Sequence, residues 1–301
     1  MQNGEGTGVD EGTWPGRAPY AVCLTHDVDR IEKKVYHYLF YGLAGGLRGI
    51  LTQIDSLRLR LQGREPYWNF EHIMELEDRL GARSTFLFLN ESARGFRPKY
   101  WGRYEIGSRK VRDVIKTLDR GGWEVGLHGS YRSYDDIDLL RLEKETLEDI
   151  LGKRVRSTRQ HYLNLRNPET LRFQRAVGLE VDSTIGYTDQ VWDASRGTLP
   201  YYPDDCGILE LPITVMDTIG LHSPDVRKKT EAAVERIAAA GGLIVLDWHQ
   251  RTFSPSEYSE AVDLYVSIVE RARSARAWIA TMGEVSEHWQ ARRPPPSGRA
   301  G

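Results

Sequence analysis

Near its N-terminus the chain reads Tyr20-Ala-Val-Cys-Leu-Thr-His-Asp-Val-Asp29, an apolar run that ends in two aspartates one residue apart. Successive side chains of a β-strand point to opposite faces, so Asp27 and Asp29 lie on one face while His26 and Val28 lie on the other. Two carboxylates held this close disfavour each other's ionised form. Such a pair therefore typically binds a cation or divides into a proton acceptor and a ligand. An ordinary solvent-exposed loop could also contain two such aspartates. The rest of the sequence must therefore decide between a loop and a functional site.

Short apolar or β-branched runs alternate along the chain with longer amphipathic stretches. Strands are predicted near residues 20–25, 84–90, 123–127, 178–184, 208–214, 243–248 and 277–281. Helices are predicted near residues 70–80, 108–120, 138–151, 168–177, 225–240, 257–274 and 283–290. This alternation is typical of βα units around a mainly parallel sheet or barrel.

The two ends of the chain differ from the middle in composition. Residues 1–18 are Gly-rich and polar, and residues 291–301 carry Pro and Gly without apolar periodicity, so we expect both to be disordered tails around one domain at 19–290. An insertion at about 31–66 follows the first strand and mixes aromatic and aliphatic residues. It would suit a helical lid, a dimer surface or a membrane-surface patch. Packing or a lid is favoured, because the stretch lacks a concentrated Lys/Arg face.

Charge and hydropathy exclude several classes of partner. Lysine and arginine number 41 against 43 aspartates and glutamates among 301 residues, so no global field indicates nucleic acid or an anionic membrane. No apolar stretch is long enough to span a bilayer and the N-terminus does not resemble a leader, so a cytoplasmic location is expected. The sequence does not indicate an oligomeric state.

Polar residues follow several of the predicted strands. In parallel α/β folds the active site lies at the carboxyl ends of the strands, so these residues are expected to meet. A single histidine would be interpreted as structural, whereas several at strand ends beside carboxylates favour a functional site. The set consists of Asp27, Asp29, His128, the segment Arg159-Gln-His-Tyr162, Asp182 and His249.

These motifs, in this order, resemble those of the polysaccharide deacetylase family, also called the NodB-homology or carbohydrate esterase family four proteins. The segments that carry the resemblance are Thr25-His-Asp-Val-Asp29, Glu124-Val-Gly-Leu-His128, Arg159-Gln-His-Tyr162 and the late strand that ends in His249. The resemblance covers most of residues 20–285. It implies an α/β fold, a distorted (β/α) barrel of about seven parallel strands.

The resemblance also implies an activity and roles for these residues. The protein would be a metal-dependent hydrolase that removes an N-acetyl group from a saccharide or saccharide precursor, with Asp27 as base and His249 as proton donor. Arg159 would hold Asp27 ionised, and Asp182 would keep His249 protonated. The candidate substrate-binding side chains are Tyr131, Tyr162, Trp192 and Trp248.

One position departs from the family's pattern. The second histidine of its His-x-x-x-His motif corresponds to Arg132, whose guanidinium stays protonated and cannot ligate a cation. The family's metal triad is thereby reduced to Asp29 and His128. His161 is the preferred candidate for the missing third ligand, because imidazole suits zinc and similar metals. A serine oxygen from position 130 or 133, additional water molecules or the loss of metal binding are the alternatives.

The predicted metal ligands are thus Asp29, His128 and His161. Zinc is the first choice of metal, and cobalt, nickel and manganese are alternatives, because sites of this composition accept each of them. Two further functions stay open. The chain could be a catalytically impaired saccharide-binding protein with the deacetylase fold, or a related hydrolase of a non-sugar amide, since a fold does not fix a substrate.

Overall fold

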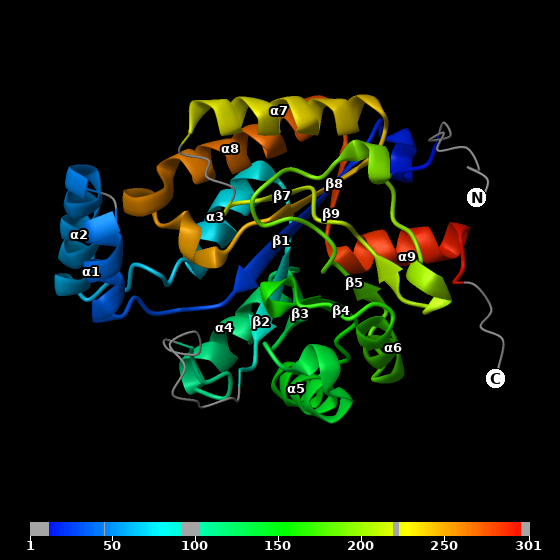
Figure 1. Cartoon of the computed structure of the whole chain (residues 1–301), viewed down its shortest axis with the longest axis horizontal. Coiled ribbons are helices and arrows are strands. Elements are labelled where there is room, and N and C mark those ends of the chain that lie inside the picture. Colours follow the sequence, from blue (N-terminus) through cyan, green and yellow to red (C-terminus); the bar gives the residue numbers. More distant parts are fainter. Residues whose placement is uncertain (1–11, 45, 92–102, 219–222, 296–301) are drawn as a thin grey trace.

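In the computed structural model, which describes residues 12–44, 46–91, 103–218 and 223–295, the chain folds around a parallel β-sheet (Figure 1). The strands are β1 (Ala21–Val28), β2 (Thr85–Leu89), β3 (Glu124–Gly129), β4 (Ser157–Gln160), β5 (Val181–Asp182), β6 (Leu209–Glu210), β7 (Val215–Met216), β8 (Leu243–Asp247) and β9 (Trp278–Ala280). Their order is β6-β5-β4-β3-β2-β1-β8-β7, and β9 pairs with the first half of β1. All eight ladders between these strands are parallel.

The predicted parallel α/β architecture is confirmed, with two differences. The described residues form nine strands rather than about seven, and no ladder among them joins β6 to β7, so the sheet is an open half-barrel. Two strands, β4 and β7, are absent from the predicted set: Ser157-Thr-Arg-Gln160 of β4 contains no apolar residue, and β7 has only two residues. The four side chains of β4 are nevertheless all buried.

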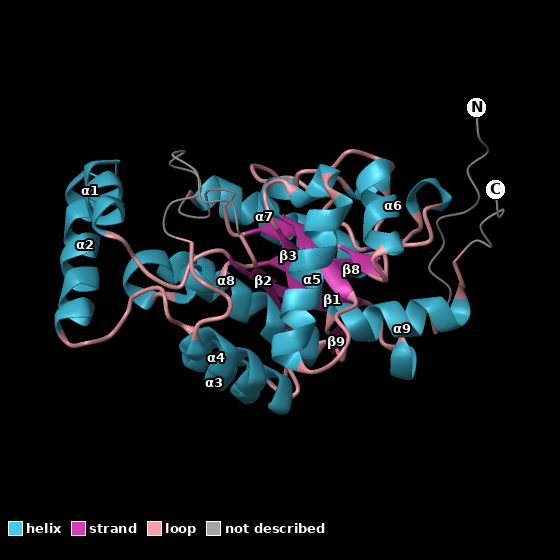
Figure 2. Ribbon diagram, turned by 90° about the horizontal axis from the view of Figure 1, so that it is seen from below, coloured by secondary structure: helices cyan, strands magenta, loops and turns pink. Residues whose placement is uncertain are grey.

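The helices cover the outside of the sheet, with α7 and α8 on one side and α4, α5 and α6 on another (Figures 1 and 2). The helices are α1 (Val35–Ala44), α2 (Gly46–Leu61), α3 (Phe70–Leu80), α4 (Arg109–Arg120), α5 (Ile137–Leu151), α6 (Glu169–Ala176), α7 (Pro224–Ala239), α8 (Pro255–Ser274) and α9 (Met282–Arg292). The seven predicted helices agree with α3 to α9 to within two residues at each end. None of the described helices is long and apolar enough to cross a bilayer.

The predicted tails are partly folded. Trp14 is buried, its Nε1 donates to the carbonyl of Gly241 at 2.7 Å, and its ring lies near those of Trp278 and Trp289. The predicted end of the disordered N-terminal tail at residue 18 is therefore wrong. Residues 12–18 are folded, and Trp14 packs near the amino-terminal ends of the strands. At the other end α9 continues through Arg292. Residues 1–11 and 296–301 lie outside the described residues.

Strand β1 runs through the middle of the sheet, and all eight of its residues are buried. Ala21 and Cys23 pack inside the half-barrel, whereas Val22 and Leu24 pack against the outer helices. A strand covered on both faces is typical of parallel sheets. The polar residues at the end of β1 alternate in the same way. Those on the outer face join a structural hydrogen-bond network, and those on the inner face belong to the candidate functional site.

On the outer face, His26 contacts a buried carboxylate on α3. Glu77 accepts hydrogen bonds from His26 Nε2 at 2.8 Å and from Tyr265 Oη at 2.6 Å through one oxygen, and from Ser84 Oγ at 2.9 Å and Trp123 Nε1 at 2.7 Å through the other. Burial alone would raise the pKa of Glu77, but His26 and the other donors outweigh it, so the pKa lies below its ordinary value. The carboxylate therefore links α3 to β1, β3 and α8.

We predict that Glu77→Ala lowers the free energy of unfolding by about 3–5 kcal/mol, because it leaves several buried donors without their partner. Since the folded-state pKa is depressed, this stabilisation is present above the unfolded pKa of about 4.3 and disappears as the pH falls through the folded value. Urea denaturation at neutral and acid pH measures both effects. The exposed neighbour Glu75 is the matched control, and Glu75→Ala should change stability by about 0.5 kcal/mol at most.

Candidate metal centre and active site

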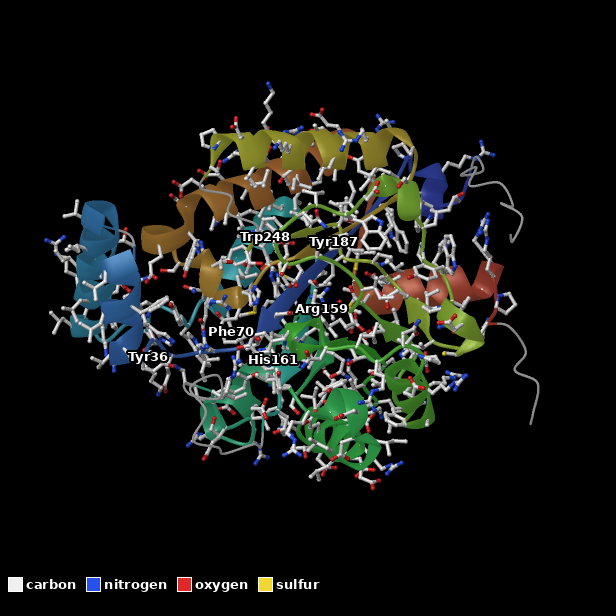
Figure 3. All side chains as sticks on the ribbon, viewed as in Figure 1. Tyr36, Phe70, Arg159, His161, Tyr187 and Trp248 are labelled. Carbon is white, nitrogen blue, oxygen red and sulfur yellow. The ribbon has the colours of Figure 1, made fainter. Side chains whose placement is uncertain are left out.

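The predicted strand-end residues meet at the carboxyl edge of the sheet. Strand pairing places His128 of β3 opposite Arg159 of β4 and opposite Leu89 of β2. Asp27, near the end of β1, and Asp29, just after it, lie beside them. Figure 3 shows Arg159 and His161 close to the centre of the molecule, where these strands end. The parallel register thus gathers residues that are far apart in the sequence, from 31 positions for His128 and Arg159 to 132 positions for Asp27 and Arg159.

Three side chains form a group that suits a metal ion. Asp29 Oδ1 lies 3.3 Å from His128 Nε2 and 3.5 Å from His161 Nε2, and all three atoms lie within 4.8 Å of one another. Neighbouring ligand atoms of a tetrahedral zinc site, with bonds of about 2.0–2.2 Å, are separated by about 3.3–3.6 Å. Asp29 Oδ1 is buried and forms no hydrogen bond with a described residue. The donor set therefore fits a divalent cation.

Backbone groups outside the metal group orient the two histidines. His128 Nδ1 lies 3.0 Å from the carbonyl of Arg159 and donates to it, which leaves Nε2 directed at Asp29. His161 directly follows β4, and the next two residues, Tyr162 and Leu163, adopt the left-handed region with φ of 60° and 54°. Such backbone conformations cost about 1–3 kcal/mol each and concentrate at functional sites. Here the strained turn directs His161 into the group.

The local charges give the three donors different protonation tendencies. Burial together with the charges of Arg103 and His128 lowers the pKa of His161 to about 4, so its ring is neutral at pH 7. Burial also lowers the pKa of His128, but Asp27 and Asp29 outweigh it and raise that pKa above its usual value. Because a metal requires neutral imidazole, binding is expected to release a proton from His128.

Two arginines also approach this group. Arg103 Nη2 donates to His161 Nε2 at 2.9 Å, and Arg103 Nη1 lies 3.7 Å from Asp29 Oδ2. Arg251 Nη1 lies 3.6 Å from the same oxygen. The donors therefore attract cationic groups, and Arg103 uses the lone pair that a metal would need from His161. No motif in the sequence indicated either arginine.

The position that departs from the family's pattern lies outside the group. Arg132 is exposed and precedes a short 3-10 helix (Ser133–Asp135). Ser133, one of the alternative ligands, is buried and donates its hydroxyl to the carbonyl of Ser130 at 3.2 Å. Of the replacements considered from the sequence, His161 is the side chain that lies beside Asp29 and His128.

Asp27 lies next to the group and is bound by a buried guanidinium. Arg159 Nη1 donates to Asp27 Oδ1 at 2.7 Å and lies 3.0 Å from Asp247 Oδ1, and the arginine is fully buried. Burial raises the pKa of Asp27, but Arg159 and His128 outweigh it, so the pKa lies below its usual value. Asp247 shares the same guanidinium, and burial raises its pKa to about 7. The prediction that Arg159 pairs with Asp27 agrees with this geometry, whereas Asp247 was not anticipated.

His249 approaches the other carboxylate oxygen of Asp29, with its Nε2 3.7 Å from Oδ2. Its Nδ1 contacts Asp217 Oδ1 at 2.8 Å, and Asp217 also accepts from the His249 backbone N–H at 2.8 Å and from Thr252 Oγ1 at 2.6 Å. Burial lowers the pKa of His249, but the charge of Asp217 outweighs it and raises that pKa to about 9. The raised pKa favours the protonated form of the His249 ring at neutral pH.

The carboxylate that contacts His249 is thus Asp217, and the prediction of Asp182 for this role is wrong. Asp182 is buried at the end of β5, where it accepts from Gln174 Nε2 at 2.9 Å and Thr184 Oγ1 at 2.7 Å. It also lies beside Glu210, and burial raises the pKa of both carboxyls. Asp217 follows the two-residue strand β7, which is too short to leave a pattern in the sequence.

The candidate sugar-binding aromatics divide into two groups. Tyr131 and Tyr162 lie beside the metal group, with ring centroids 5.6 Å apart, and Tyr162 is 51% exposed. Trp248 is fully buried and donates to the carbonyl of Ala261, so the prediction that it stacks on a sugar is wrong. Trp192 is nearly buried and lines a cavity of about 680 Å³ beside α7, none of whose lining residues belongs to the metal group.

No family model and no curated protein matches this sequence. Among solved structures, the chain resembles a Mycobacterium smegmatis protein assigned as a polysaccharide deacetylase, with a TM-score of 0.62, 17% identity and coverage of 98% of this chain and 99% of that one. The likeness to the Puue allantoinase has a TM-score of 0.62 and 17% identity, and covers 95% of each chain. For a Pseudomonas aeruginosa PAO1 protein assigned as a polysaccharide deacetylase, the TM-score is 0.60 and the identity 17%, with coverage of 95% of this chain and 96% of that one. The chain therefore has the NodB-type fold of polysaccharide deacetylases.

We predict that His161→Ala lowers the affinity of the metal-free protein for zinc by about 100-fold or more, because losing a direct ligand costs more than the 10–100-fold typical of outer contacts. Isothermal titration calorimetry with a zinc salt measures the affinity. Arg132→Ala is the matched control and should leave it unchanged. Equal affinities of the wild-type protein and the His161 variant would mean that water or another oxygen completes the coordination shell.

Proposed function

We propose that the protein is a metal-dependent hydrolase of an amide carbon–nitrogen bond and that its substrate is an N-acetylated saccharide. The observation that carries the proposal is the arrangement around Asp29. The donors Asp29, His128 and His161 converge between an aspartate with a depressed pKa, Asp27, and a histidine with a raised one, His249. The fold shared with proteins assigned as polysaccharide deacetylases supports the same class of reaction.

A divalent metal held by Asp29, His128 and His161 would polarise the amide carbonyl and lower the pKa of a water molecule. Asp27 supplies the base for that water. Its Oδ2 lies 3.5 Å from His128 Nε2, so the carboxylate borders the metal group, and Arg159 holds it in the ionised form that accepts a proton. Arg159 touches no substrate in this scheme and acts by positioning Asp27.

His249 supplies the proton that an amine needs in order to leave. Asp217 fixes the ring through Nδ1, so that Nε2 points toward the metal group, and its charge keeps the imidazole protonated. Base and acid therefore both border the metal group, Asp27 beside His128 and His249 beside Asp29. Hydrolysis of an amide requires this division, because one group must take a proton from the nucleophile while another gives a proton to the leaving nitrogen.

The saccharide part of the proposal relies on the aromatic pair beside the group. Tyr162 directly follows His161, is half exposed and packs edge-to-face with Tyr131. An exposed tyrosine face adjacent to the reacting atoms suits the apolar face of a sugar ring. We assign Tyr131 and Tyr162 to substrate binding on this basis.

A hydrolase of a non-sugar amide is the second candidate. The likeness to the Puue allantoinase is as close as that to the deacetylases, at a TM-score of 0.62 and 17% identity. Assays of the zinc-loaded protein with N-acetylated mono- and oligosaccharides and with allantoin distinguish the two candidates. Turnover of neither class, with zinc bound, would favour an impaired protein that only binds its ligand.

We predict that Asp27→Asn lowers turnover of the substrate by about 10²–10⁴-fold, the usual contribution of a general base, while zinc content stays near that of the wild type. Asp29→Ala should instead lose the metal. Acetate release and metal analysis on the same preparations measure both properties. The exposed Asp189 is the control, and Asp189→Asn should alter neither. Loss of metal in the Asp27 variant, with retention in the Asp29 variant, would reverse the two assignments.

A further inference from the structure

The insertion after β1 forms a helical hairpin, α1 and α2, whose outer face is apolar. Figures 1 and 2 both place this hairpin at one end of the molecule, standing away from the sheet. Thirteen large hydrophobic side chains are exposed in the described residues, and ten of them belong to residues 35–61. Leu43 is 82% exposed, Leu61 80%, Val35 71%, and Leu39 and Phe40 65% each.

The face of the hairpin that touches the body is polar. Lys33, at the base of the hairpin, is buried and donates through Nζ to Gln53 Oε1 at 2.5 Å, to Ser56 Oγ at 3.0 Å and to Glu257 Oε1 of α8 at 2.5 Å. Ser56 is fully buried and donates to Glu257 at 2.6 Å. A surface helix of a monomer normally turns its apolar stripe inward. The hairpin does the reverse, so its apolar stripe needs another partner.

The size of the outer face matches a protein interface. If a fully exposed large side chain offers about 150–250 Å², the exposed parts of the ten residues sum to about 900–1,500 Å² over the hairpin. The largest apolar patch of a typical monomer is about 300–600 Å², and a standard interface buries about 800 Å² on each partner. A groove of about 490 Å³ also runs between the two helices, lined mainly by Leu39, Leu43, Ile50, Ile54 and Leu57.

The charges around the face favour protein over lipid. An interfacial helix binds a membrane through free lysines and arginines that flank its apolar stripe. Here several cations are engaged: Lys34 pairs with Glu32, Arg58 pairs with Asp55, and Arg60 donates to the carbonyl of Lys33. Lys33 pairs with Glu257. Four cations near the hairpin thus already have partners within the protein, which favours an apolar contact with another protein surface over attraction to an anionic membrane.

We infer that the apolar face of the α1–α2 hairpin is the interface of a symmetric dimer, in which the hairpins of two copies pack face to face as a four-helix bundle. A twofold contact presents the same patch twice, and this hairpin offers both ridges and a groove of matching character. The dimer is independent of the proposed hydrolase activity, because its residues take no part in the metal group.

Sedimentation velocity of the full-length protein over micromolar to submillimolar concentrations tests the dimer. The wild-type protein should sediment as a dimer. Leu43→Glu should weaken association by about 100-fold or more, because it buries an unpaired charge in an apolar contact. The matched control is Leu142→Glu on α5, since Leu142 is 56% exposed and lies outside the hairpin. This variant should dimerise like the wild type.

A monomeric wild-type protein, or a Leu43→Glu protein that dimerises like the wild type, would overturn the inference. Flotation with vesicles of phosphatidylcholine and phosphatidylglycerol covers the lipid alternative: binding by a monomeric wild-type protein that Leu43→Glu abolishes would assign the face to a membrane instead. Circular dichroism checks that each variant is folded. If Leu43→Glu does not fold, the milder double variant Leu39→Ser with Leu43→Ser replaces it and should also be monomeric.

Discussion

Arg159 is fully buried in the sheet, and a guanidinium cannot lose its proton, so the residues around it must balance its charge. Its Nη1 contacts Asp27 and Thr25 of β1 and lies beside Asp247 of β8, while Nε and Nη2 donate to Ser183. One side chain thereby joins β4 to β1, to β8 and to the end of β5. The same pairing explains why Asp27 stays ionised although it is buried. The pairing of Arg159 with Asp27 thus both stabilises the sheet and maintains the proposed catalytic base.

The metal group follows from the period of the central strand. Because alternate residues of β1 face the same side, placing Asp27 against Arg159 also turns Asp29 toward the interior, where His128 and His161 meet it. In the proposed site the third donor, His161, comes from the turn after β4, whereas Arg132 is exposed to solvent. A ligand that comes from a different loop changes which segments must stay ordered, since the strained turn at Tyr162 and Leu163 now supports the site.

Much of the fold could be predicted from the sequence because its helices are long and periodic and its central strands are apolar. Strand β4 could not, since its polar residues are buried by hydrogen bonding rather than by hydrophobicity. In the site, the residues at the ends of strong strands were identified, whereas Asp217 follows a strand of two residues and Asp247 lies within an apolar run. Both become visible only in three dimensions, where Asp217 contacts His249 and Asp247 faces Arg159. Trp14 was missed for a similar reason, because a lone tryptophan in a Gly-rich segment leaves no periodicity.

The central claim is that Asp29, His128 and His161 together hold a divalent metal. Anomalous X-ray diffraction from crystals of the zinc-loaded protein, recorded on both sides of the zinc absorption edge, tests it most directly. The account predicts one strong peak bonded to Asp29 Oδ1 and to the Nε2 atoms of both histidines, at about 2.0–2.2 Å from each, with Arg103 displaced from His161. A peak without His161 in its coordination shell, or no peak between these residues in zinc-saturated crystals, would contradict it.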